Sequence, residues 1–359
     1  MTRLRRFSGG SRRRAQIFTI VSMATIDGNT LEGISATTPW TLHHRASGAK
    51  RSNVVRFLAP LLAAIVTSAG CGALPTEVTE TPAAAEVEVL PEVTVQRFEY
   101  AADSEQNWAD LYLPAGPQQV DSIPLVVLIH GGAWQSKLGA DVFDGLAREL
   151  ADHGMAVYNI EYRRVGSGGG WPTTFHDVAT ALDYVTEVDK RFPQLTVDDE
   201  LVVGHSAGAQ LAVWAGTRHK LRDDEVGSHP SFRPTRVVSL AGPLDMVYAA
   251  EHGDHHIVRV LGGRPTEVPD RYTSVDPIQN IDPEVPVLAL HGTRDTVVSP
   301  ENSRRYVAAV KQQGGRAAVK MLTGENHTSI VSLRSPSHDE VLRAITTTSQ
   351  TDLDDLLTE

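Results

Sequence analysis

A serine stands between two glycines in the pentapeptide Gly204-His205-Ser206-Ala207-Gly208. It follows the short apolar run 201–203 and opens a helix-compatible stretch over residues 209–217. A strand–turn–helix of this kind is so tight that the positions flanking the serine must carry almost no side chain. The serine then lies at a helix start, where unpaired N–H groups and the helix dipole favour negative charge. The pattern predicts that Ser206 is a nucleophile in acyl transfer.

A second glycine-rich turn, His130-Gly131-Gly132-Ala133-Trp134, follows the apolar run 124–129. Such an unbroken run is typical of a strand buried on both faces. Acyl transfer places negative charge on an oxygen atom, which backbone N–H groups stabilise when they point at it. We expect the N–H groups of Gly132, Ala133 and Ala207 to form this oxyanion hole. The alternative is a plain strand-to-helix turn.

An acid and a base follow two apolar runs downstream of the serine. The run 286–290 leads to Asp295, and the run 318–322 leads to His327. The order serine, aspartate, histidine, with each residue in a loop after a strand, predicts a catalytic triad. Ser206 would attack, and His327 would take its proton and return it to the leaving group. Asp295 would fix the imidazole tautomer and stabilise the imidazolium.

Other residues compete for these roles. Asp245 follows the strand expected over residues 236–240 and is the alternative acid. Three histidines lie inside the motif turns, where packing or loop hydrogen bonding is the expected role: His130, His205 and His291. Three more lie beside Asp254 and resemble a metal cluster, but no further run of ligands accompanies them: His252, His255 and His256. We therefore expect a solvated excursion there, and no metal.

The motifs resemble those of the α/β-hydrolase fold superfamily over roughly residues 93–345. The His-Gly-Gly-x-Trp loop and the Gly-His-Ser-Ala-Gly turn are most similar to bacterial esterase-type members, which include feruloyl-esterase-like, kynurenine-formamidase-like and prolyl-oligopeptidase-like hydrolases. The stretches 161–164 and 168–172 also resemble this group. Ala133 stands where many lipases and esterases carry a third glycine, which bears on the room for bulky acyl groups. The resemblance implies a fold and a catalytic apparatus rather than a substrate.

Strands and helices alternate around these motifs, which implies a mostly parallel central sheet with helices on both faces, the α/β-hydrolase fold. The polar segment 248–281, with its glycines, prolines and histidines, predicts a small irregular lid beside the site. We expect an early antiparallel pair at 96–100 and 108–113, further strands at 156–160 and 201–203, and helices at 140–153, 174–190, 207–219 and 303–313.

Composition indicates one large catalytic domain. The chain has 359 residues, of which 41% are hydrophobic, enough for a single core over residues 93–347. Its net charge of −11 argues against nucleic acid as a partner. Residues 348–359 form an acidic tail that we expect to be solvated.

The N-terminal part differs in composition from the catalytic domain. Residues 1–53 are arginine-rich and predict a disordered leader, which we attribute to a start codon assigned too far upstream. The basic residues Lys50, Arg51 and Arg56 precede the apolar run 57–66 and the small residues that follow it, which is the pattern of a secretory signal and assigns residues 54–71 to the signal and lipobox segment. Residues 72–92, rich in Pro, Thr, Ala and Glu, predict a flexible acidic linker.

Cys71, the only cysteine, ends the sequence Ser68-Ala69-Gly70-Cys71, which resembles a bacterial lipobox with serine where leucine is usual. We expect lipidation of Cys71 and hence an exported lipoprotein on the extracytoplasmic side of the cell membrane, or a secreted protein. The alternative is a free cysteine in a disordered leader.

Together these features predict a serine hydrolase that cleaves a small-molecule carboxylic ester through an acyl-enzyme on Ser206, with no cofactor. An arylformamidase-like enzyme, or another C–N hydrolase such as an amidase or peptidase, is the alternative within the enzyme class. A catalytically inactive hydrolase fold that serves as a binding module is the alternative outside it.

Overall fold

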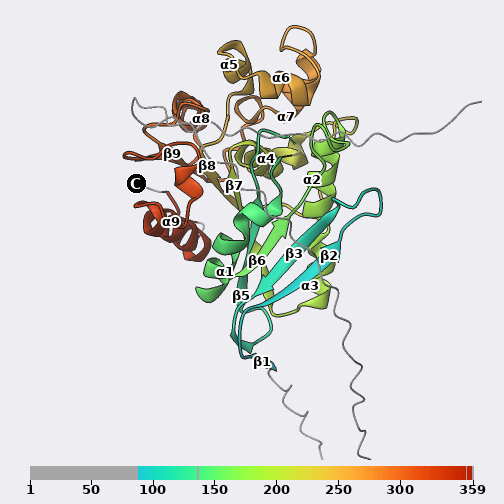
Figure 1. The fold of residues 1–359 in the computed structure, drawn as a ribbon, viewed down its shortest axis with the longest axis vertical. Coiled ribbons are helices and arrows are strands. Elements are labelled where there is room, and N and C mark those ends of the chain that lie inside the picture. Colours follow the sequence, from blue (N-terminus) through green and yellow to red (C-terminus); the bar gives the residue numbers. More distant parts are fainter. Residues whose placement is uncertain (1–87, 136, 353, 358–359) are drawn as a thin grey trace, which may run out of the picture. The chain divides into compact units, whose positions relative to one another are not determined.

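The computed structural model describes residues 88–135, 137–352 and 354–357, and their core is an eight-stranded sheet (Figure 1). The strands lie in the order β10-β9-β8-β7-β5-β6-β3-β2. The last two strands of this order are antiparallel to their neighbours, and all other pairs are parallel. The strands are β2 (Thr94–Glu99), β3 (Trp108–Leu113), β5 (Ile123–Ile129), β6 (Ala156–Ile160), β7 (Leu195–His205), β8 (Arg236–Leu240), β9 (Val287–Gly292) and β10 (Ala317–Leu322). The predicted antiparallel pair and mostly parallel sheet are confirmed.

Helices cover both faces of the sheet because each central strand is apolar on both sides. In β5, Leu125 and Val127 face one hydrophobic cluster and Val126 and Leu128 face the other. The second cluster is covered by α1 (Asp144–Asp152) and α9 (His338–Gln350). The first is covered by α2 (Thr173–Asp183), α3 (Val185–Arg191), α4 (Ala207–Thr217) and α8 (Glu301–Gln312).

The lid segment is helical, so the prediction of an irregular excursion at 248–281 is wrong. It contains α5 (Met246–Glu251), α6 (His255–Leu261) and α7 (Pro269–Val275). Side chains fix the starts of two of them: Asp245 accepts a hydrogen bond from the backbone of α5, and Asp254 does so for α6. All three helices also bury apolar residues in the core, but with six or seven residues each they are too short to show a clear apolar periodicity in the sequence.

The C-terminal segment also differs from expectation. Helix α9 is not predicted from the sequence, and it continues past residue 347, where we expected the acidic tail to begin. Leu356 is only 5% exposed, so part of that tail packs on the domain. At the other end, residues 88–90 of the expected linker form β1 (Glu88–Leu90), which pairs with β4 (Gly116–Gln118).

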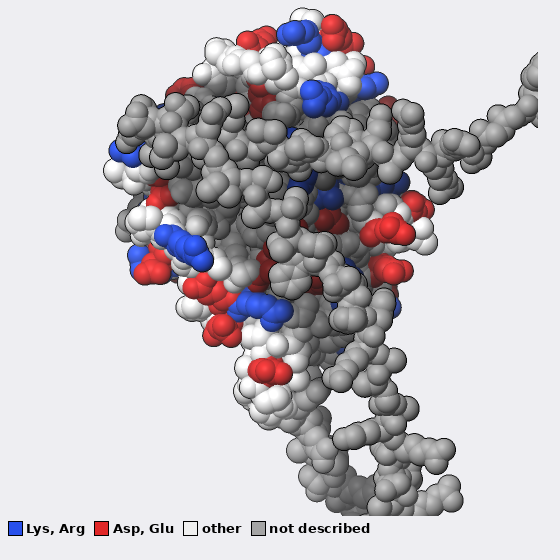
Figure 2. Space-filling view, viewed as in Figure 1, with Lys and Arg blue, Asp and Glu red and all other residues white. Residues whose placement is uncertain are grey.

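The predicted leader (1–53), the signal and lipobox segment with Cys71, and residues 72–87 of the linker lie outside the described residues. Export and lipidation therefore stay predictions. None of the helices in the described residues is long and apolar enough to cross a membrane. On the face drawn in Figure 2, acidic and basic side chains of the described residues are interspersed.

Asp276 is a buried carboxylate that anchors the lid. It is fully buried, and its oxygens accept hydrogen bonds from the backbone N–H groups of Met246 (2.9 Å) and Val247 (3.4 Å) at the start of α5. Burial raises the pKa of Asp276 to about 6, although these hydrogen bonds and one from Gln279 favour the ionised form. The start and the end of the lid are therefore joined through a group that titrates near neutral pH.

The raised pKa predicts a pH dependence of stability. A carboxyl group whose pKa is higher in the folded state stabilises the fold at low pH, and this contribution is lost as pH rises from about 4 to about 6. An asparagine at this position does not ionise, so the Asp276→Asn variant should not lose this contribution. Between pH 4 and pH 7 we expect its free energy of unfolding to rise by on the order of 3 kcal/mol relative to that of wild type. Urea unfolding at a series of pH values measures the difference. Asp270→Asn, on the exposed first turn of α7, is the control and should track wild type. Parallel curves for wild type and Asp276→Asn would contradict the assignment.

Candidate active site

Ser206 lies in the turn between β7 and α4 with φ +55° and ψ −120°. A non-glycine residue in this left-handed region is strained and persists only when its surroundings hold it there. The neighbouring glycines are required by space. A Cβ atom on Gly204 would collide with the backbone of Gly208, and one on Gly208 would collide with the carbonyl oxygen of Ile129. The turn thus presents the serine hydroxyl at the C-terminal end of the sheet.

Ser206, His327 and Asp295 form a continuous chain of hydrogen bonds. His327 Nε2 lies 2.7 Å from Ser206 Oγ, and His327 Nδ1 lies 2.7 Å from Asp295 Oδ2. All three side chains are buried, with exposures of 6–8%. Asp245, the alternative acid, is elsewhere: it caps α5 through Tyr248 N–H (2.9 Å) and pairs with Arg305 (2.7 Å). The structure brings Asp295, and not Asp245, to His327.

Asp295 is held in its ionised form. Burial alone would raise its pKa, but hydrogen bonds from His291 and His327 hold the pKa far below the usual range of an aspartate. Its other oxygen accepts hydrogen bonds from the backbone N–H groups of Val297 and Val298, both at 2.9 Å. Asp295 can therefore accept the Nδ1 proton of His327 in a hydrogen bond and stabilise the imidazolium without becoming protonated.

The histidines of the motif turns make the loop hydrogen bonds that we expected of them. His205 Nε2 donates to the carbonyl oxygen of His327 (2.8 Å), and burial lowers the pKa of His205 to about 4, so that its ring is neutral at neutral pH. His291 contacts Val298 O (3.0 Å) on the loop that carries Asp295. The backbone of His327 is thus held against the turn that carries Ser206.

Two of the predicted oxyanion donors, Gly132 and Ala133, lie in a strained loop, and the third, Ala207, begins α4. Gly132, Ala133 and Trp134 all have positive φ, at +114°, +55° and +53°. In the described part of the chain, none of the N–H groups of Gly132, Ala133 and Ala207 donates a hydrogen bond within the protein. These N–H groups are therefore available to donate hydrogen bonds to an oxyanion, as an oxyanion hole requires.

A cleft of about 450 Å³ opens above Ser206. Ala133 and Trp134 line its base, residues 295–299 form one wall and the lid forms the other. His252, His255 and His256, which we expected in a solvated excursion, are exposed but line this cleft beside Asp254. Among the described residues, no group of three or more His, Cys, Asp or Glu side chains is arranged to hold a metal ion. The position of these histidines points to contact with substrate.

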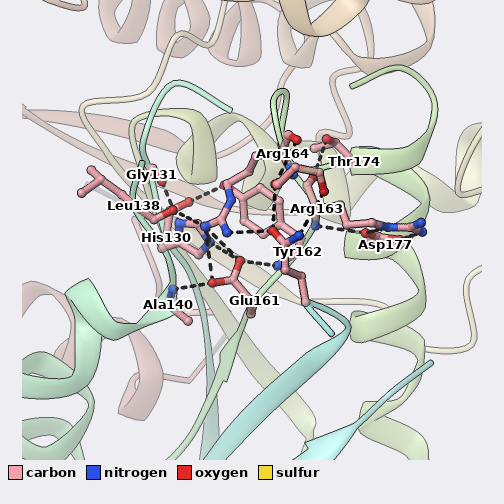
Figure 3. Close-up of polar contacts among 12 residues, drawn as sticks. His130, Gly131, Leu138, Ala140, Glu161, Tyr162, Arg163, Arg164, Thr174 and Asp177 are labelled. Atoms are coloured by element: carbon pink, nitrogen blue, oxygen red, sulfur yellow. Dashed lines mark hydrogen bonds and ion pairs between the residues drawn. The ribbon is translucent and has the colours of Figure 1, made fainter. Parts of the chain in front are cut away.

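Two carboxylates that support loops of the site were not predicted from the sequence. Glu325 accepts hydrogen bonds from Ser335 (2.7 Å) and Ser329 (2.5 Å), and so braces the loop that carries His327. Glu161 forms a buried cluster with His130 and Arg164 (Figure 3). The stretch 161–164 contributes to the family resemblance, but its contacts with the glycine-rich loop could not be predicted from the sequence, because His130 and Ala140 lie 31 and 21 positions from Glu161.

Comparison with known proteins agrees with this geometry. Esterase LipQ of Mycobacterium tuberculosis is 24% identical over 225 residues, 60% of this chain and 52% of that protein. The probable isoprenylcysteine alpha-carbonyl methylesterase ICME of Oryza sativa subsp. japonica is 24% identical over 245 residues, 64% of this chain and 56% of that protein. The chain thus spans little more than half the length of these relatives.

Solved structures share the fold. Esterase B from Lactobacillus rhamnosis superposes with a TM-score of 0.60 at 19% identity, covering 74% of this chain and 89% of that one. A truncated carbohydrate esterase from gut microbiota gives a TM-score of 0.60 at 21% identity, covering 74% of this chain and all of that one. Residues 109–310, more than half of the sequence, match the profile of the family described as BD-FAE. The chain therefore belongs to the BD-FAE family, a group of the esterase-type α/β-hydrolases.

Proposed function

We propose that this protein is a carboxylesterase that cleaves esters through an acyl-enzyme on Ser206. The observation that carries the proposal is the hydrogen-bonded chain Ser206–His327–Asp295 at the base of an open cleft. The coarser assignment to ester hydrolysis is supported by the relatives, which are named esterases.

The reaction follows from the geometry. Ser206 Oγ attacks the acyl carbon of the ester while His327 Nε2 takes its proton. The carbonyl oxygen becomes negatively charged and is stabilised by the N–H groups of Gly132, Ala133 and Ala207. The C–O bond to the alcohol breaks, and His327 protonates the departing oxygen. His327 then takes a proton from a water molecule, whose oxygen attacks the acyl carbon. The bond between this carbon and Ser206 Oγ breaks, the carboxylic acid leaves, and His327 returns the proton to Ser206 Oγ.

The cleft favours esters with a short acyl chain and a polar alcohol. Its lid side presents the side chains of His252, Asp254, His255 and His256, and its other wall presents Thr296 and Ser299. These groups can hydrogen-bond to hydroxyls or other polar substituents, whereas a long alkyl chain would leave them desolvated and unpaired.

The proposal predicts the substrate preference of the purified protein. We expect kcat/KM to be highest for p-nitrophenyl acetate to butyrate and to fall by at least tenfold for acyl chains of eight carbons or more. Aryl formamides and peptide amides should be hydrolysed more slowly than the acetate ester. Ser206→Ala serves as the blank in each assay. A higher kcat/KM for an aryl formamide than for the acetate ester would instead favour a C–N hydrolase.

A further inference from the structure

A buried cluster of two charged side chains and a histidine lies behind the oxyanion loop, defined as residues 130–140 (Figure 3). Its members Glu161, Arg164 and His130 are 4%, 6% and 0% exposed. None of the three lines the catalytic cleft. Burying charges is costly unless they are paired and hydrogen-bonded, so the contacts of this cluster show what it holds in place.

The carboxylate of Glu161 joins the two ends of the oxyanion loop. Its Oε1 lies 3.2 Å from His130 Nε2 at the start of the loop and 3.0 Å from Arg164 Nη1. Its Oε2 accepts a hydrogen bond from the backbone of Ala140 (3.0 Å), at the end of the loop. Burial alone would raise the pKa of Glu161, but the hydrogen bond from His130 and the charge of Arg164 hold it below its usual value. Glu161 is thus a stable anion at neutral pH.

The same short segment holds the loop at further points along its length. Residues 162–165 all follow strand β6, whose end lies beside that of β5 in the sheet. The additional hydrogen bonds are Tyr162 OH to His130 O (2.8 Å), Arg164 Nη1 to Leu138 O, and Val165 N–H to Trp134 O (2.8 Å). The loop is therefore attached at its start, its middle and its end to one short segment, residues 161–165, which directly follows β6.

The loop needs such attachment because its backbone is strained. Ala133 and Trp134 are consecutive non-glycine residues at φ +55° and +53°. Each costs about 1–2 kcal/mol relative to ordinary backbone, so an unrestrained loop would leave this conformation. The directions of the N–H groups of Gly132 and Ala133 would change with it.

We propose that Glu161, Tyr162 and Arg164 are positioning residues that hold the oxyanion hole in its working conformation. The proposal rests on the esterase mechanism argued above. These residues act through the loop and do not touch the substrate. A preorganised hole stabilises the oxyanion of the transition state more than the neutral carbonyl of the bound ester. Loss of the attachment should therefore lower kcat and leave KM nearly unchanged.

The test is Glu161→Gln, which keeps the size of the side chain and removes its charge. We expect kcat for p-nitrophenyl acetate to fall about a hundredfold, the effect of losing one oxyanion donor, with KM changed less than threefold. The inhibition constant of phenylboronic acid, which forms a tetrahedral anionic adduct with the serine hydroxyl, should rise by the same factor as kcat/KM falls. A merely structural defect would lower thermal stability without this selective loss of affinity for the adduct.

Asp282→Asn is the matched control. Asp282 is 5% exposed, contacts His219 (2.8 Å) and forms an ion pair with Arg233 (3.3 Å). None of these three residues lies in the segment 161–165 or lines the catalytic cleft. We expect this variant to lose thermal stability while kcat and the boronate inhibition constant stay at wild-type values.

A milder variant keeps the inference testable if Glu161→Gln does not fold. Tyr162→Phe removes only the hydroxyl that bonds to His130 O and keeps the ring stacked on His130, 4.4 Å between centroids. We expect about a tenfold loss in kcat and a parallel loss of boronate affinity. Folded variants whose boronate affinity matches wild type would overturn the inference. Failure of wild type to hydrolyse esters, or to react at Ser206, would instead overturn the proposed function.

Discussion

Replacing Ser206 with alanine is expected to lower kcat for p-nitrophenyl acetate by on the order of a million-fold, because loss of a triad nucleophile removes the covalent route altogether. The serine hydroxyl is the only group of this residue in the hydrogen-bonded chain with His327. The backbone of the turn should persist, since it is fixed by Gly204 and Gly208 and by the bond from Ser206 N–H to Leu240 O (2.8 Å). Steady-state kinetics and covalent labelling by a fluorophosphonate measure the effect.

The fold of the Ser206→Ala variant should be unchanged by circular dichroism and thermal unfolding. Labelling of wild type should give one modified peptide, which contains Ser206. If the alanine variant still labelled at a serine, the nucleophile would have to be sought elsewhere in the chain.

The second large effect is expected at Asp295. Asp295→Asn should lower kcat about ten-thousand-fold, because an amide in place of the carboxylate favours the wrong imidazole tautomer and cannot stabilise the imidazolium. The present carboxylate lies 2.7 Å from His327 Nδ1 and is kept ionised by its hydrogen bonds. The amide oxygen of the asparagine can still accept hydrogen bonds from the backbone N–H groups of Val297 and Val298, so the loop 295–299 should keep its conformation.

Asp245→Asn is the matched control for this substitution. The two aspartates are similarly buried, with Asp245 4% and Asp295 7% exposed, and each follows a strand. Asp245, however, caps the first lid helix and forms an ion pair with Arg305. We expect its loss to change kcat less than tenfold. The opposite ranking of the two aspartates would contradict the assignment of the acid.

The strands and the turns they lead into could be predicted because their signals are local. The run 124–129 and the pentapeptide at 204–208 each satisfy a constraint within a few residues: apolar side chains on both faces, or glycine where a Cβ has no room. The lid helices and the buried cluster of Glu161 could not be predicted in this way. Both depend on contacts between residues far apart in the chain, such as that of Asp276 with the start of α5, which joins positions 30 residues apart.

The sequence by itself determined which residue types could do the chemistry, and in what order they occur. A serine in a glycine-flanked turn, an aspartate and a histidine each follow an apolar run, and these are short-range patterns that elementary sterics and hydrophobicity explain. Only the tertiary structure decided which of them meet. Ser206 and His327 are 121 positions apart, and they follow β7 and β10, which β8 and β9 separate in the sheet. They meet because these strands are parallel and their C-terminal ends share one edge, where the loop after β10 brings His327 to Ser206. The choice of Asp295 over Asp245, the place of the lid histidines at the cleft, and the attachment of the oxyanion loop to residues 161–165 follow from that same strand order. No local pattern in the sequence encodes the strand order, because that order depends on which apolar faces of strands and helices can be buried together.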